Sequence, residues 1–80
     1  MAHAQDQLSP ERLIEAAEAA FTAAREVWRS RGGTMPYPAA LMGAPDQPHY
    51  LSEFTRWEIE QASQFLVRLG MIPKPTKRFG

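Results

Sequence analysis

Residues 54–70, with the sequence FTRWEIEQASQFLVRLG, carry the signals that begin, sustain and end a helix. Thr55 followed by Glu58 matches a capping box, in which the hydroxyl and the carboxylate each accept from a backbone N–H of the first turn. Gly70 suits the left-handed conformation in which helices often end. The stretch therefore predicts a helix over residues 53–69. Its apolar positions recur at three- and four-residue spacing and form one face: Ile59, Ala62, Phe65, Leu66 and Leu69.

A first helix is predicted upstream, over residues 9–31. Ser9 is a favourable N-cap, Pro10 is tolerated in the first turn, and Gly32 with Gly33 ends the helix. Its apolar positions fill about half of the circumference at 100° per residue. Within that half, small side chains form a trough and bulky ones form a ridge at seven-residue spacing. The trough is Ala16, Ala20 and Ala23, and the ridge is Ile14, Phe21 and Trp28.

This apolar arc is wider than one neighbouring helix can cover, which predicts a homodimer. Small residues let another helix approach closely, and part of the arc also follows a short heptad pattern. We therefore expect an all-α, two-helix hairpin that dimerises into an assembly resembling a four-helix bundle. The predicted dimer interface consists of Leu13, Ala16, Ala20, Phe21, Ala23, Val27 and Trp28.

The rest of the chain is expected to form an ordered connector and two ends within one domain over residues 1–80. Residues 32–52 contain four prolines and three glycines, but they also carry apolar side chains that favour packing over disorder. Residues 1–8 are polar and are expected to fray. Residues 71–80 form a basic tail in which prolines oppose a regular helix.

Composition argues against several classes of protein. Nine basic and nine acidic side chains cancel, so no overall field attracts nucleic acid or an anionic membrane. The absence of cysteine excludes disulfides and thiolate metal sites. The start, MAHAQDQL, lacks the features of a signal peptide, and no run is long and apolar enough to span a bilayer. We expect a protein of the cytoplasm.

Candidates for enzyme chemistry are weak. His3 and His49 are the only imidazoles, and neither has a metal-ligand spacing with carboxylates. Ser9 and Ser52 precede helices and are better explained as caps than as nucleophiles. The sequence therefore predicts no catalytic residue, no metal and no cofactor.

A second surface of this chain is predicted to bind another protein. Trp57 and Val67 project away from the apolar face of residues 53–69, so one helix neighbour cannot cover them all. A tryptophan at the start of a rigid helix is typical of an interface anchor, although the connector folding over Trp57 is an equally good explanation. For Trp28, core packing is favoured over an aromatic–basic surface. The predicted partner-binding residues are Tyr50, Arg56, Trp57, Val67 and Arg68.

An alternative is a winged-helix-like DNA-binding regulator. The segment LSEFTRWEIEQASQFLVRLGMIPKPTKR, residues 51–78, resembles a recognition helix followed by a basic stretch. In that case Arg56 and Arg68 would contact phosphates. A proline-rich connector, however, stands where short helices are expected, and no strand-forming wing follows.

One family resemblance covers residues 37–70. It rests on the run 37–43 (YPAALMG) together with Gln47-Pro48, Leu51, Phe54-Thr55, Glu58-Ile59, Ala62, Phe65-Leu66 and Leu69-Gly70. These residues resemble small early proteins of Mu-like transposable phages. The resemblance implies a non-enzymatic inhibitor that dimerises and binds a host protein in the host cytoplasm, such as a LuxR-type quorum-sensing transcriptional activator. It assigns no individual binding residue.

Overall fold

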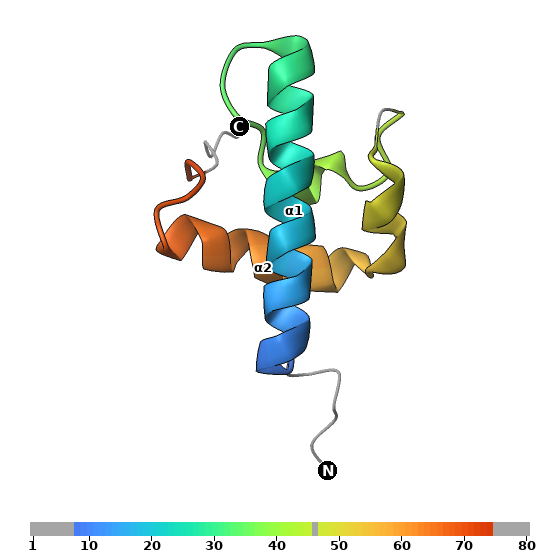
Figure 1. Cartoon of the computed structure of the whole chain (residues 1–80), viewed down its shortest axis with the longest axis vertical. Helices are drawn as coiled ribbons and strands as arrows, with labels where there is room; N and C mark the ends of the chain where they lie inside the picture. The colour runs from blue at the N-terminus through green and yellow to red at the C-terminus, as the bar shows by residue number, and fades with distance from the viewer. Residues whose placement is uncertain (1–7, 46, 75–80) are drawn as a thin grey trace, which may run out of the picture.

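A computed structural model of the chain describes residues 8–45 and 47–74. This part is all-helical and contains no strand, as the sequence predicts. Two α-helices form the hairpin, and two short 3₁₀ helices lie between them. The elements are α1 (Pro10–Arg31), η2 (Pro38–Leu41), η3 (His49–Glu53) and α2 (Arg56–Arg68). The long α1 crosses α2, so the two helices do not run side by side along their lengths (Figure 1).

The helix ends form through the local contacts that their sequences favour. The Ser9 hydroxyl accepts from the Arg12 N–H at 3.1 Å and so caps α1. At the start of α2 the Thr55 hydroxyl accepts from the Glu58 N–H at 3.1 Å, and the Glu58 carboxylate accepts from the Thr55 N–H at 2.9 Å. The predicted capping box is therefore present.

The end of α2 is a Schellman motif. The Gly70 N–H donates to the Val67 carbonyl at 3.0 Å, and the Met71 N–H donates to the Leu66 carbonyl at 3.0 Å. This geometry needs a positive φ at the residue after the helix, and Gly70 has a φ of 77°. The chain then turns back, so that Ile72 is buried in the core.

The core forms where α1 crosses α2. Ala16, Ala20 and Ala23 of α1 have no exposed surface, which is what a close approach between two helices requires. On α2, Ser63 is buried with them, and its hydroxyl donates to the Ile59 carbonyl at 2.7 Å, so no polar group is left unpaired there. The larger buried side chains of α2 are Ile59 and Leu66.

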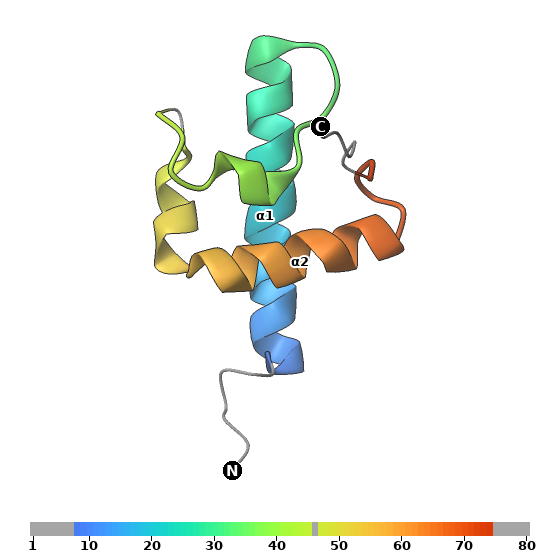
Figure 2. The same ribbon diagram turned by 180° about the vertical axis from the view of Figure 1, so that it is seen from behind.

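The connector belongs to the core. Figure 2 shows η2 lying across α1 beside α2. Ala39 and Leu41 of η2 and Leu51 of η3 are buried in the same cluster as the alanines of α1. Residues 32–52 therefore cover part of the α1 surface that the single α2 leaves open.

The ends are described only in part. Of the predicted frayed segment, residues 1–7, with His3, lie outside the described residues, as do residues 75–80 of the predicted basic tail. No helix in the described ranges is long and apolar enough to cross a membrane.

Candidate functional site

Most of the predicted dimer interface lies inside the single chain. Ala16, Ala20 and Ala23 have no exposed surface, and Val27 is buried with them, because α2 and the connector cover the trough. In this conformation a second copy has almost no side-chain surface to contact at these positions. The small residues thus admit a helix as the sequence indicates, but that helix is α2 of the same molecule. Leu13 and Phe21 are half-buried at the edge of the core.

The ridge of α1 lies at the surface. Ile14 is 52% exposed and Trp28 is 42% exposed, so Trp28 is not a core residue, contrary to the favoured prediction. The Trp28 indole N–H donates to the Gly33 carbonyl at 2.6 Å, which holds the ring against the end of α1 while one side faces solvent. We call Ile14, Phe21 and Trp28 the α1 ridge.

An apolar groove lies between the α1 ridge and the second half of α2. It encloses about 180 Å³, and Glu18 is its one charged lining residue. Met71, which follows the Schellman turn, lines the groove and is 45% exposed. The apolar lining residues are Ile14, Ala17, Phe21, Phe65, Leu66 and Met71. A groove with so little polar lining suits an apolar occupant.

The predicted partner-binding residues fall into separate places. Trp57 is 38% exposed, so it is not fully covered within the chain, and Arg56 and Arg68 are also exposed. Arg68 follows Trp57 by eleven residues, about three turns, and shares its face of α2. Val67 is half-buried and packs against the core.

Tyr50 does not join that surface. Its hydroxyl donates to the Glu26 carboxylate of α1 at 2.9 Å, so it ties η3 to α1. Burial and this hydrogen bond raise the pKa of Tyr50 to about 12. Tyr50 is therefore a structural contact that holds the connector in place.

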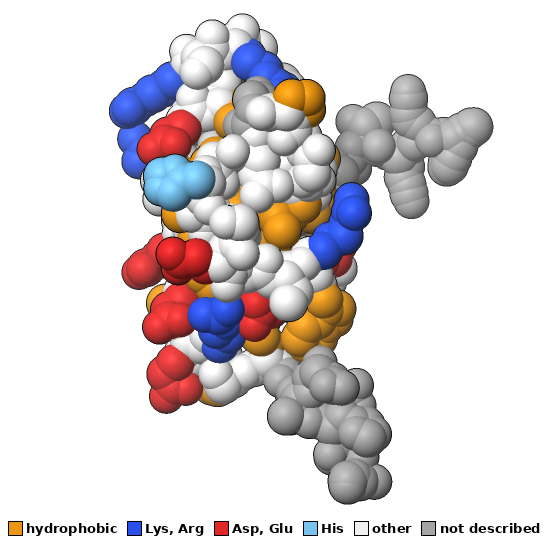
Figure 3. Space-filling view, turned by 90° about the vertical axis from the view of Figure 1, so that its right-hand side faces the viewer, with side chains coloured by type: hydrophobic (Ala, Val, Ile, Leu, Met, Phe, Trp, Pro, Cys, Tyr) orange, Lys and Arg blue, Asp and Glu red, His pale blue; other side chains and the backbone are white. Residues whose placement is uncertain are grey.

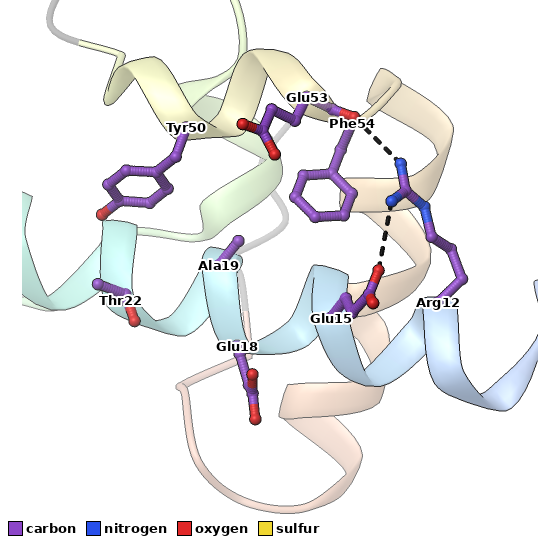
Figure 4. A pocket seen from close by; sticks show the side chains of 8 residues that line it. All are labelled: Arg12, Glu15, Glu18, Ala19, Thr22, Tyr50, Glu53 and Phe54. Atoms are coloured by element: carbon purple, nitrogen blue, oxygen red, sulfur yellow. Dashed lines mark hydrogen bonds and ion pairs between the residues drawn. The ribbon is translucent and has the colours of Figure 1, made fainter.

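An open cleft between η3 and α1 was not predicted. It has a volume of about 540 Å³ and is lined by the rings of Tyr50 and Phe54 and by three carboxylates, those of Glu15, Glu18 and Glu53. Figure 4 shows these side chains around the cleft, with Arg12 at one end. Acidic side chains also gather on this face of the whole molecule (Figure 3).

Arg12 joins the two helices at the edge of this cleft. Its guanidinium makes two hydrogen bonds to the Glu58 carboxylate, at 2.9 and 3.1 Å, and donates to the Glu53 carbonyl at 3.0 Å. It also lies 4.3 Å from the centre of the Phe54 ring. The hydrogen bonds from Arg12 hold the pKa of Glu58 below its ordinary value, and the pKa of Arg12 is raised in return. We call this arrangement the Arg12 clamp.

The remaining polar candidates have structural contacts. The Ser52 hydroxyl donates to the His49 carbonyl within η3 at 2.6 Å, so Ser52 does not cap α2 as predicted. The His49 ring meets the Tyr50 ring edge to face at 5.6 Å. Within the described ranges no three His, Asp or Glu residues are grouped as a metal site would require.

Comparison of the chain with protein-family models, curated proteins and solved structures gave no match.

Proposed function

We propose that this chain is a small, non-enzymatic protein that binds and inhibits another protein, and that it works as a homodimer. The observation that carries the proposal is the number of large apolar side chains that the single chain leaves in water. Small soluble proteins rarely expose contiguous apolar surface without an interaction that covers it, and two of these side chains, Ile14 and Met71, line the same apolar groove. The exposed ones are Ile14, Trp28, Trp57, Leu69 and Met71.

The α2 surface around Trp57 is the proposed contact with the target. Tryptophan contributes a large rigid area to an interface, and arginine is enriched beside it in the residues that dominate binding energy. Trp57 and Arg68 share one face of α2 and lie outside the core, so a partner can reach both without disturbing the fold. The resemblance to phage early proteins supports a target in the host cell, such as a quorum-sensing transcriptional activator.

The proposal is tested by titrating the purified chain into the ligand-binding domain of a LuxR-type activator and following the heat of binding. Trp57→Ala should weaken binding by about thirtyfold, as the loss of a central aromatic anchor typically does. Leu69→Ala is the matched control, because it removes another exposed apolar side chain, at the C-cap of α2 and about 120° around the helix axis from Trp57.

Wild-type protein that binds no such activator would overturn this class of target. If Trp57→Ala and wild type bound equally well, the target would not contact the α2 surface around Trp57. Urea unfolding of both variants must give wild-type midpoints for the comparison to be valid.

The second candidate function is DNA binding, which the exposed Arg56 and Arg68 on α2 favour. Against it, the described residues after α2 contain no strand that would form a wing. Phosphate contacts would make affinity fall steeply as salt rises, whereas an apolar contact would not. Fluorescence anisotropy with duplex DNA at two salt concentrations separates the two candidates.

A further inference from the structure

One long side of α1 is covered by no other element. Figure 1 shows α1 in front of α2 and the connector, with no described segment crossing over it. The α1 ridge lies along the edge of this side and spans about 21 Å, at 1.5 Å per residue. The ridge is apolar and partly exposed, as described above.

Charged residues flank the ridge in a particular order. Glu11 and Glu18 lie in the first half of α1, and Arg25 and Arg29 lie in the second half. At 100° per residue, all four project within about 60° of Ile14. All four are exposed. The strip of α1 beside the ridge is therefore acidic toward its start and basic toward its end, while Glu26, farther round the helix, accepts from Tyr50.

Within the described ranges, neither Glu18 nor Arg25 forms an ion pair, in contrast to Arg12, which pairs with Glu15 and Glu58. Arg25 instead places its guanidinium 5.8 Å from the centre of the Phe21 ring, beside the ridge. When two copies of such a helix pack antiparallel, the acidic half of each lies beside the basic half of the other, so their charges are complementary.

We propose that a second copy of this chain covers the uncovered side of α1, with the two α1 helices antiparallel and crossing near Phe21. The twofold axis then brings Phe21 against its own counterpart, and Ile14 against the partner subunit's Trp28. Glu18 lies beside the partner subunit's Arg25, twice per dimer. A parallel pair would instead place like charges together. This inference rests on the self-association proposed above, and it assigns the interface to the ridge in place of the alanine trough.

Charge reversal tests the arrangement by sedimentation equilibrium. Glu18→Arg or Arg25→Glu alone puts like charges together at both places where residue 18 of one subunit meets residue 25 of the other. Each variant should raise the dimer dissociation constant by about tenfold or more. An equimolar mixture of the two variants should associate as tightly as wild type, because the mixed dimer restores both pairs. Glu53→Arg is the matched control for Glu18→Arg, since it makes the same charge change on η3, across the open cleft from Glu18 and outside the ridge. It should leave dimerisation unchanged.

Several results would overturn the inference. Wild-type protein that remains a monomer up to about 100 µM would refute the dimer. Single variants that associate like wild type, or a mixture that does not recover, would refute the antiparallel register. None of these results bears on target binding by Trp57, which the calorimetric titration tests separately. The side chains of Glu18, Arg25 and Glu53 are all exposed, and far-UV circular dichroism of each variant checks its fold.

Discussion

At the scale of single residues, the Arg12 clamp is the contact that sequence patterns could least predict. The capping box of Thr55 and Glu58 is a local pattern over four residues, and it is found as predicted. Arg12 meets Glu58 across 46 positions of sequence, and no periodicity links the two. Only the fold, which brings the first turn of α1 against the start of α2, reveals that Glu58 serves both as a cap and as an ion-pair partner.

The clamp predicts how stability depends on acid. Because the pKa of Glu58 is lowered in the folded protein from its ordinary value of 4.5, its contribution is complete above that value and is lost as pH falls through the folded pKa. We expect the free energy of unfolding to fall below about pH 4.5, and Glu58→Gln to make that fall shallower and to lower stability at pH 7. Urea unfolding at a series of pH values measures both effects.

Glu53→Gln is the control for this experiment, because it changes a neighbouring carboxylate while Arg12 donates to the backbone carbonyl of Glu53, which the substitution keeps. It should keep the wild-type dependence on pH. A Glu58→Gln profile parallel to that of wild type would show that the clamp contributes nothing to acid sensitivity.

At the scale of elements, the two α-helices follow from local signals, whereas the role of the alanine trough does not. Ser9, Thr55 and Gly70 mark helix ends in the sequence, and the structure uses each of them. The trough shows that a helix can approach closely, but a pattern of small residues does not say whether that helix belongs to the same chain. The path of the connector determines the outcome, because η2 and η3 pack on α1 beside α2 and close the trough, while Ile14 and Trp28 stay exposed.

The closed trough predicts the effect of a larger side chain within it. Ala20→Leu forces three carbons into the helix crossing, where Ala20 has no exposed surface, and should lower the free energy of unfolding by about 1–3 kcal/mol. Ala19→Leu makes the same change one residue earlier, where the side chain borders the open cleft, and should have little effect. Urea unfolding compares the two variants. Equal effects would mean that the crossing can loosen to admit a larger side chain.

At the scale of the whole molecule, the sequence predicts an all-helical chain with two helices, and the structure agrees. What it could not predict is which apolar side chains remain outside. Trp28 and Ile14 belong to the same apolar arc as the alanines, and only the path of the connector separates the covered part from the exposed part. The candidate surfaces therefore depend on tertiary packing. Of the predicted partner-binding residues, the structure leaves Arg56, Trp57 and Arg68 exposed on α2 and uses Tyr50 to tie η3 to α1.

Because the connector shares the core, the molecule should unfold as one unit. Leu51→Ala removes a fully buried side chain of η3 and should lower the free energy of unfolding by about 2–5 kcal/mol. Helix content from circular dichroism and tryptophan fluorescence should then report one coincident transition at lower urea. If η3 lost its tertiary contacts at a urea concentration at which both helices remain folded, the connector would be an independently unfolding unit.

The Arg12 clamp also bears on how fast the native state is reached. Each helix can form from neighbours in sequence within microseconds, but the clamp spans 46 positions and exists only after the intervening loop has closed. We therefore expect the closing of this loop to limit the rate of folding, with the distance along the chain between arginine and glutamate setting its entropic cost.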